Sequence, residues 1–391
     1  MEQLAKWKEL PIFAVIFVTI FLVSGILMSG GLFLASIIIW PFSRYYYRQI
    51  SYYFIYPVWA QLVFLIDWWA PSEVILYTDE AAQKHIGTEH AMVVMNHSYD
   101  IDWLAGWLIC ERAALLAATK VFAKRSLSYV PVIGWLWRLG EIIFLDRNWQ
   151  KDRTCIANQI AQISQYANPV WILLFPEGTR FTPSKHSVSM EFAKKEGLPM
   201  LKHLLTPRTR GFVLTMQAIK ESGNKIRAIY DTTIGFANGP GINEPTLSNL
   251  IKGRPVQAHM KVSRIPMENV PSEEKDATEW LHKSFVQRDK LLEQFEHTNR
   301  FEGRHYLLPR RPYTLLNEIF WIVTVIGGAL YYSLTTPWIP WWFLPLMTAA
   351  LSVALHYLIN VTVSKKGSTY GKATARNQEG RIITATEKKD A

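Results

Sequence analysis

The sequence predicts an α/β domain that is held at a membrane by apolar segments on both sides of it. Two long stretches without a charged side chain, 10–43 and 319–364, lie near the two ends of the chain. Between them, 73–311 has ordinary charge density and alternates short apolar runs with longer mixed segments. That alternation is typical of strands and helices packed in layers.

The composition narrows the class of protein before any motif is considered. The 391 residues are 49% hydrophobic, which excludes a disordered chain, and two cysteines exclude a disulfide scaffold or a multi-cysteine metal site. The formal net charge is +10, and there are 16 Trp and 17 Tyr. Positive charge attracts anionic lipid and nucleic acid alike. Because the aromatic residues concentrate in and beside the apolar stretches, we expect a lipid bilayer as partner and no nucleic acid.

Residues 1–72 are expected to form a membrane anchor. The run 10–43 is long enough for one spanning helix, which needs about 20 residues, and longer than the apolar part of a signal peptide, about 7–15 residues. The sequence Ser29-Gly30-Gly31 leaves open a bend and a re-entrant hairpin. The aromatic segment at about 50–69 predicts an interfacial helix lying on the membrane, with a buried core helix as the alternative.

Residues 312–364 predict a hairpin of two transmembrane helices. Prolines and tryptophans in 336–342 are typical of a turn at the membrane surface. The excess of lysine in the tail 365–391 places that tail, and with it the domain 73–311, in the cytosol. Lys388 and Lys389, the fourth and third residues from the end, resemble a dilysine retrieval signal, so we expect a multi-pass protein of the endoplasmic reticulum membrane.

Six short apolar runs in the middle of the chain predict strands, and three segments between or after them predict helices. The strands are expected at 74–77, 92–95, 142–145, 170–175, 226–230 and 258–262. The helices are expected at 152–166, at 188–196 and in a long segment that begins near Ser272.

A histidine and an aspartate separated by four residues, His97 and Asp102, follow the second predicted strand. On one continuous helix their side chains would point about 140° apart. They can meet only if His97 lies in the turn and Asp102 in the first turn of the next helix. Asp102 would then accept from one imidazole nitrogen and leave the other to take a proton, as in a general base. Asp100 is a rival for the orienting role.

Three further segments place arginine at strand ends or turns. In 175–180 an apolar run enters a turn with glycine and ends at Arg180, which suits a phosphate or carboxylate. The segment 140–147 ends at Arg147, and 207–212 carries Arg208 and Arg210. Together these arginines indicate a shared pocket that binds an anionic group. No metal site is expected, because none of the ten His shows paired ligand spacing.

These four blocks, in this order and spacing, resemble those of the glycerolipid acyltransferase family. Segments 120–135 and 280–295, with the paired C-terminal apolar runs, are similar to the long eukaryotic branch of 1-acyl-sn-glycerol-3-phosphate acyltransferases. The resemblance extends over about 5–370 and implies a mixed sheet flanked by helices. It also implies the reaction of acyl-CoA with lysophosphatidate, in which acyl-CoA is a substrate and no cofactor is needed.

The resemblance further implies roles for individual residues. His97 is the base and Asp102 orients it. The groups that bind the glycerol-phosphate of the acceptor are Glu177, Gly178, Thr179 and Arg180, with Arg147 and Phe144, and the groups associated with the acyl donor are Pro207, Arg208 and Arg210. A thioester is already activated, and the sequence has no Gly-x-Ser-x-Gly elbow, so no covalent acyl-enzyme is expected. The alternatives are an acyltransferase for another lysophospholipid acceptor, such as lysocardiolipin, and a non-catalytic membrane scaffold with the same fold.

Overall fold

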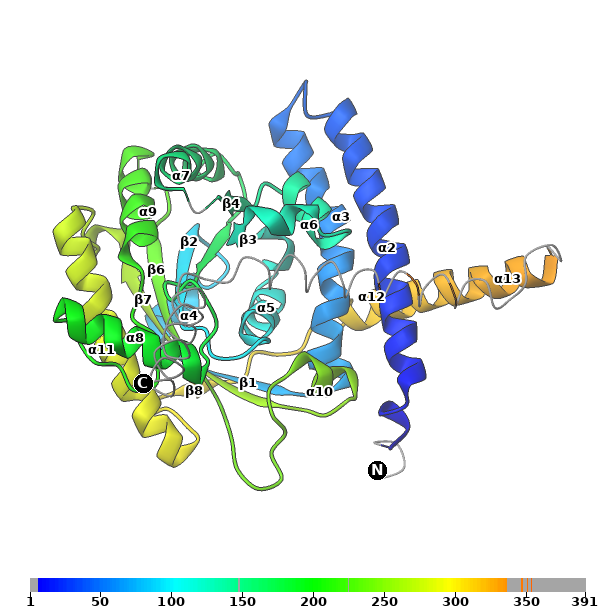
Figure 1. Cartoon of the computed structure of the whole chain (residues 1–391). Coiled ribbons are helices and arrows are strands. Elements are labelled where there is room, and N and C mark those ends of the chain that lie inside the picture. Colours follow the sequence, from blue (N-terminus) through cyan, green and yellow to red (C-terminus); the bar gives the residue numbers. More distant parts are fainter. Residues whose placement is uncertain are drawn as a thin grey trace, which may run out of the picture.

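The computed structural model describes residues 6–146, 148–223 and 225–335, together with residues 346, 350 and 353. Its centre is an eight-stranded sheet in the order β4-β3-β5-β2-β6-β7-β1-β8 (Figure 1). The strands are β1 (Glu73–Tyr77), β2 (Ala91–Met95), β3 (Thr119–Lys124), β4 (Ile143–Leu145), β5 (Trp171–Leu174), β6 (Ala228–Phe236), β7 (Gln257–Pro266) and β8 (His305–Tyr306). All six predicted strands overlap with observed ones, whereas β3 and β8 were not predicted.

The sheet is mixed. Strands β4, β3, β5, β2 and β6 are parallel, so their carboxyl ends share one edge. Strand β7 is antiparallel to β6 and parallel to β1, and β8 is antiparallel to β1. The predicted fold class, a mixed sheet flanked by helices, is confirmed.

Different helices cover the two faces of the sheet. Helices α3 (Arg44–Phe64) and α5 (Asp102–Arg112) share one hydrophobic core with the sheet. Helices α7 (Trp149–Ile163), α9 (Thr209–Glu221) and α11 (Glu274–Thr298) form the core on the other face, as Figure 1 shows. The shorter helices are α4 (Glu80–His85), α6 (Ile133–Leu139), α8 (Pro183–Glu196) and α10 (Leu247–Ile251). Single turns occur at Leu65–Trp69, Leu116–Ala118, Arg125–Tyr129, Met267–Asn269 and Val323–Gly327.

The first apolar run forms one helix, α2 (Pro11–Ile38), which packs along α3. It continues through Ser29-Gly30-Gly31, so the chain does not bend back there. A Cβ on Gly31 would lie 2.4 Å from Cε1 of Phe54, and one on Gly25 would lie 2.2 Å from Cγ1 of Val132. These glycines therefore permit close packing of α2 against its neighbours.

Helix α3 was expected to lie on the membrane surface, and its buried face belongs to the main core of the domain. Tyr47, Val58 and Trp59 are buried, and the ring of Trp59 lies 5.1 Å from that of Trp107 in α5. This face matches the alternative of a core helix. The domain boundary at residue 72 stays a prediction, because a single core extends across it.

The C-terminal apolar segment begins as α12 (Tyr313–Ile322) and continues through a π turn into α13 (Gly328–Thr335). Asn317 Nδ2 donates to the Pro57 carbonyl at 2.9 Å, which ties α12 to α3, and Trp68 Nε1, in the turn after α3, donates to Thr314 Oγ1 at 3.0 Å. By length and composition, Pro11–Ile38, Arg44–Trp69 and Tyr313–Tyr332 could each cross a membrane. The predicted turn 336–342, most of the second hairpin helix, and the tail 365–391 lie outside the described residues.

Candidate active site

The candidate active site lies at the carboxyl edge of two neighbouring parallel strands, β2 and β5. The chain leaves β2 at Met95 and β5 at Leu174, so the loops that follow lie side by side. In open α/β sheets ligands bind outside this edge. The buried side chain of Asn96 fixes the first loop, because its Oδ1 accepts from the backbone N–H of Ile234 at 2.8 Å and its Nδ2 donates to the Ile234 carbonyl at 3.0 Å.

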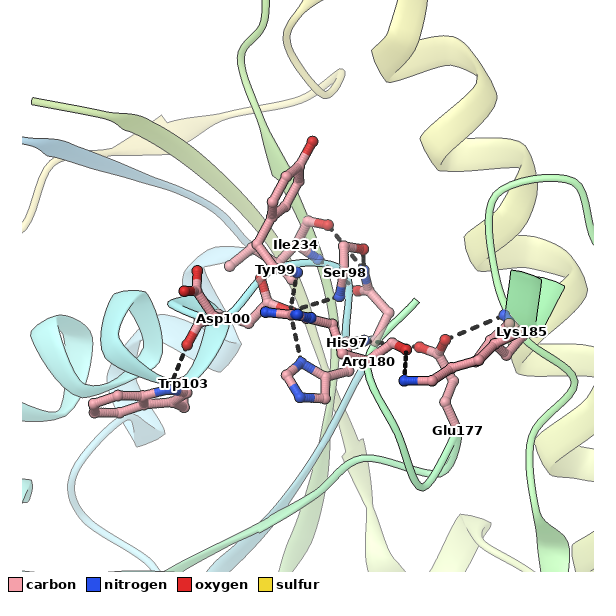
Figure 2. A network of polar contacts seen from close by, with 12 residues as sticks. His97, Ser98, Tyr99, Asp100, Trp103, Glu177, Arg180, Lys185 and Ile234 are labelled. Carbon is pink, nitrogen blue, oxygen red and sulfur yellow. Dashed lines mark hydrogen bonds and ion pairs between the residues drawn. The ribbon is translucent and has the colours of Figure 1, made fainter. Parts of the chain in front are cut away.

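His97 and Asp102 meet in the predicted way. His97 lies in the turn, Asp102 is the first residue of α5, and His97 Nδ1 is 2.9 Å from Asp102 Oδ2. The same oxygen accepts from the backbone N–H groups of Ser98, at 2.6 Å, and Tyr99, at 2.9 Å (Figure 2). Asp100 instead uses its carbonyl, which accepts from a tryptophan side chain. Asp102 is thus the carboxylate that contacts the imidazole.

The two partners differ in access. The Asp102 side chain is fully buried, whereas 21% of the His97 side chain is exposed. Burial raises the pKa of Asp102, and the hydrogen bonds from His97, Tyr99 and Ser98 oppose that rise. The Phe175 ring stacks on the imidazole with centroids 4.3 Å apart. Because Nδ1 faces Asp102, Nε2 is the nitrogen that can take a proton from a ligand.

The side chain of Glu177 points into the protein, between two loops. Its side chain is fully buried, Oε1 accepts from the backbone N–H of His97 at 2.7 Å, and Oε2 accepts from that of Leu205 at 3.1 Å. Burial raises its pKa to about 8. Both Glu177 oxygens thus accept backbone N–H groups, and its role in binding the glycerol-phosphate stays a prediction. Glu177 ties two loops together.

The turn after Glu177 brings Arg180 beside the His97 loop. The N–H of Phe181 donates to the His97 carbonyl at 2.8 Å, which joins the two loops directly. Gly178 has φ +66, and a Cβ there would lie 3.1 Å from Cδ of Arg208, so the turn requires glycine. The Arg180 side chain is exposed and lines an open cavity of about 770 Å³ together with Ser98.

A second cation accompanies Arg180. Lys185, in the first turn of α8, donates through Nζ to Thr179 Oγ1 at 2.8 Å and to the Arg180 carbonyl at 3.1 Å (Figure 2). Burial and then the charge of Arg180 lower the pKa of Lys185. Of the two cations, Arg180 lines the open cavity, where a guanidinium suits an anionic group. The hydroxyl of Thr179 holds Lys185.

The block around Pro207 lies against the same turn. The backbone N–H of Arg208 donates to the Pro176 carbonyl at 2.8 Å. Arg208 is half-buried and Arg210, in the first turn of α9, is exposed, so both can be reached by a ligand. Pro207 itself is buried, and its role in binding the acyl donor stays a prediction.

The block 140–147 reaches the site less directly. Phe144 lies on β4, which β3 and β5 separate from β2. Its side chain is buried in a small cluster with Ala123 and Ile142, and its role in binding substrate stays a prediction. Arg147 lies outside the described residues, and its role stays a prediction.

Sequence analysis did not single out four residues at or behind this site: Asn96, Phe175, Lys185 and Arg288. Arg288 is 1% exposed and donates through Nη2 to the Val94 carbonyl in β2 at 3.0 Å. The sequence does contain a signal for Arg288. On the predicted helix, Arg288 falls within an apolar stripe that includes Phe285 and Leu292, where a charged residue is unusual.

No group of three His, Cys, Asp or Glu side chains in the described part of the chain could hold a metal ion.

With the geometry in place, comparison with known proteins identifies the family. The Acyltransferase family model matches 74–214, and the model for the acyltransferase C-terminus matches 249–321. Human 1-acyl-sn-glycerol-3-phosphate acyltransferase gamma is 38% identical over 365 residues, which cover 92% of this chain and 95% of that protein. The chain belongs to the 1-acyl-sn-glycerol-3-phosphate acyltransferase family.

Further comparisons extend over most of the molecule. The bovine 1-acyl-sn-glycerol-3-phosphate acyltransferase delta is 35% identical over 389 residues, covering 97% of this chain and 99% of that protein. The crystal structure of the 1-acyl-sn-glycerophosphate acyltransferase PlsC from Thermotoga maritima aligns with a TM-score of 0.41 and 15% identity, covering 74% of this chain and 98% of that one. The protein is an acyltransferase of phospholipid biosynthesis, which confirms the predicted family and enzyme class and sets aside the scaffold alternative.

Proposed function

We propose that the protein transfers the acyl group of acyl-CoA to the sn-2 hydroxyl of lysophosphatidate and produces phosphatidate and CoA. The observation that carries the proposal is the contact of His97 Nδ1 with Asp102 Oδ2 at 2.9 Å, in a protein whose relatives are named for this acceptor. A hydroxyl is a weak nucleophile at neutral pH, and a positioned base typically contributes about 10²–10⁴-fold to such a reaction.

In the proposed mechanism Asp102 accepts a hydrogen bond from Nδ1–H of His97 and so fixes the tautomer. Nε2 removes the proton of the acceptor hydroxyl as its oxygen attacks the thioester carbonyl. The tetrahedral intermediate collapses, the C–S bond breaks, and the imidazolium returns the proton to the CoA sulfur. The hydroxyl attacks the thioester directly, so no acyl-enzyme forms.

The charged and apolar groups around the dyad support binding sites for the two substrates. Arg180 offers a cation for the acceptor phosphate at the open cavity, and Lys185, bonded to the Arg180 carbonyl, lies next to it in the fold. On the side of α5, a small apolar cavity of about 50 Å³ is lined in part by Met95 and Trp103, which flank the dyad in sequence. This apolar lining supports an approach of the acyl chain from that side, although the cavity itself has room for only a few of its carbon atoms. Arg208 and Arg210 are the candidate contacts for the CoA phosphates.

The three apolar helices support association with a membrane, where both substrates are held. We further propose the endoplasmic reticulum as that membrane, with the catalytic domain on the cytosolic side. The lysines near the C-terminus support this, and replacing Lys388 and Lys389 with Ser tests it. The substituted protein is expected to leave the endoplasmic reticulum; its retention there would contradict the retrieval signal.

The acceptor is tested with full-length protein in detergent micelles. CoA release from oleoyl-CoA is followed with lysophosphatidate, lysophosphatidylcholine and lysocardiolipin, for the wild type and for His97→Ala. We expect release with lysophosphatidate alone and its loss in the variant. Preference for another acceptor would overturn the substrate and keep the mechanism, whereas activity without His97 would overturn the mechanism.

A further inference from the structure

The two apolar helices at the start of the chain, α2 and α3, form a hairpin that lies beside the acyltransferase domain (Figure 1). The turn 39–43 closes the hairpin at one end. At the open end, Phe13 of α2 meets Trp69, which follows α3, with ring centroids 5.1 Å apart. Each helix is long enough to cross a membrane, so the places where the domain touches the hairpin decide whether it does.

The domain covers α3 from one end to the other. Near the closed end, Arg48 donates to both oxygens of Glu141, at 2.8 and 2.9 Å, and both side chains are buried. At the open end, Arg112 Nη2 donates to Asp67 Oδ1 at 2.9 Å. The segment from Arg48 to Asp67 is about 28 Å long, close to the hydrocarbon thickness of a bilayer, about 30 Å. A hairpin that crossed the bilayer would therefore bring the domain into the hydrocarbon over its whole thickness.

Helix α2 meets the domain at its start and again at its middle. Arg254, which precedes β7, pairs with Glu9 at 2.8 Å just before α2 begins. Midway along α2, a Cβ on Gly25 would lie 2.2 Å from Cγ1 of Val132, which precedes α6. Arg138, at the end of α6, is exposed, and an exposed guanidinium is costly inside hydrocarbon. The middle of α2 therefore lies beside a part of the domain that does not fit in the centre of a bilayer.

The other face of α2 is apolar and exposed. Val15, Ile26 and Ile37 recur every eleven residues, which is about three helical turns, so they share this face, and they are 41–55% exposed. An apolar stripe of this length is unfavourable in water and suits lipid acyl chains. A helix is about 10–12 Å across, less than half the hydrocarbon thickness, so α2 fits within one leaflet. The exposed Lys6 and Arg44, one beyond each end of the uncharged run, suit lipid phosphates.

The C-terminal helices α12 and α13 have a different direction. They contact α3 and α2, run across the hairpin, and extend beyond α2 on the side away from the sheet (Figure 1). Leu330 and Leu334, in the part that extends beyond α2, are exposed. A bilayer that contains α2 lengthwise is therefore entered by α12 and α13 from the side of the domain.

We propose that α2 lies lengthwise in the leaflet nearest the acyltransferase domain, with its exposed face bound to phospholipid, and that the segment α12–α13 is the one that crosses the bilayer. The start of α2 then lies on the same side of the membrane as the catalytic domain. This membrane arrangement does not depend on which acyl acceptor the enzyme uses.

The side on which α2 begins is tested with the full-length protein in sealed microsomes, treated with a membrane-impermeant maleimide before purification. Lys6→Cys, just before α2, is compared with Lys195→Cys, an exposed position on α8 of the catalytic domain. Both are made in a Cys155→Ser background, in which the remaining cysteine, Cys110, is buried. Thermal unfolding shows that the variants are folded. We expect equal labelling of the two positions, with and without detergent.

The depth of α2 is tested with nitroxide labels at Val15→Cys, Ile26→Cys and Ile37→Cys, in the same background and in phosphatidylcholine vesicles. Accessibility to oxygen and to a water-soluble nickel complex reports the depth of each label. We expect the same depth at all three positions, whereas a crossing helix would bury residue 26 about 16 Å deeper than the other two. Phe320→Cys and Leu330→Cys are the matched pair on α12–α13, and their depths should differ by about 15 Å.

The outcomes decide each part of the proposal. Labelling of Lys6→Cys and Lys195→Cys from opposite sides of the membrane would show that α2 crosses it and would overturn the proposal. Labelling from one side, with residue 26 much deeper than residues 15 and 37, would overturn the lengthwise placement. Equal depths at residues 320 and 330 would overturn the crossing by α12–α13.

Discussion

Two buried carboxylates, Asp102 and Glu177, lie on either side of the His97 loop, and they do different things. Both are fully buried and both accept backbone N–H groups of that loop. Asp102 also reaches the imidazole, whereas Glu177 bonds to backbone alone. Burial beside a base therefore does not define a catalytic partner; the atom that the carboxylate contacts does.

The two carboxylates also belong to different faces of the sheet. Asp102 begins α5, on the face that α3 shares, so the orientation of the base depends on the core next to the membrane helices. Glu177 accepts from the N–H of Leu205, in the segment that leads to α9 on the opposite face. One layer of the domain thus orients the imidazole of His97, and the other holds the backbone of its loop.

The substitution Asp102→Asn is the strongest test of the different roles of the two carboxylates. The amide can stabilise neither the required tautomer nor the imidazolium, so we expect a fall in kcat approaching the full contribution of the base, about 10²–10⁴-fold. Steady-state kinetics with lysophosphatidate measure it. Asp100→Asn is the matched control and should stay active, because Asp100 takes part through its carbonyl. Equal losses in both variants would contradict the assignment of Asp102.

Arg180→Ala separates substrate binding from the work of both carboxylates. A hydrogen bond to a charged group is worth about 1.5–3 kcal/mol, so KM for lysophosphatidate should rise by about 10- to 150-fold. The kcat should stay near the wild-type value, since neither carboxylate contacts the Arg180 side chain in the described structure. A fall in kcat with constant KM would place Arg180 in the chemical step.

Glu177→Gln tests positioning. Glutamine keeps one acceptor oxygen, so either the His97 or the Leu205 N–H loses its partner, at about 1–3 kcal/mol. We expect a lower melting temperature and a reduced kcat, with KM unchanged. A variant as stable and active as the wild type would show that the two loops do not depend on this carboxylate.

The same variant should alter how stability depends on pH. Burial raises the pKa of Glu177 to about 8 from its ordinary 4.5, so the folded state binds the extra proton between these values. The free energy of unfolding therefore loses a contribution as pH rises from about 5 to about 8. Glu177→Gln should flatten this part of the curve, which thermal unfolding at several pH values would measure; an unaltered slope would contradict the shift.

The smallest expected effect is that of Phe175→Leu. The substitution removes the ring that stacks on His97 and keeps an apolar side chain. Aromatic stacking is worth about 0.5–1.5 kcal/mol, so kcat should fall about two- to tenfold. Kinetics beside Phe181→Leu, a neighbouring ring that does not stack on the imidazole, would test it. A larger loss than in Asp102→Asn would mean that stacking, and not the carboxylate, orients the base.

The sequence predicted the strands and the dyad because both depend on local order. The apolar run and the spacing allowed His97 in the turn with Asp102 on the next helix, and the resemblance of the four blocks to the acyltransferases implied that pair. The inward direction of Glu177 could not be predicted, since a turn residue can face either solvent or the core. Strand order is also non-local, which is why the distance of Phe144 from the dyad was missed. Strand β3 was missed because Lys120 and Lys124 interrupt its apolar pattern.

The most direct test of the account is the single-turnover rate of phosphatidate formation by His97→Gln beside the wild type, in micelles with oleoyl-CoA in excess over enzyme-bound lysophosphatidate. If His97 is the base, the rate constant falls by about 10²–10⁴-fold while lysophosphatidate binding is retained. A loss of less than about tenfold, or a burst of acyl-enzyme in the wild type, would contradict general-base transfer by the His97–Asp102 pair.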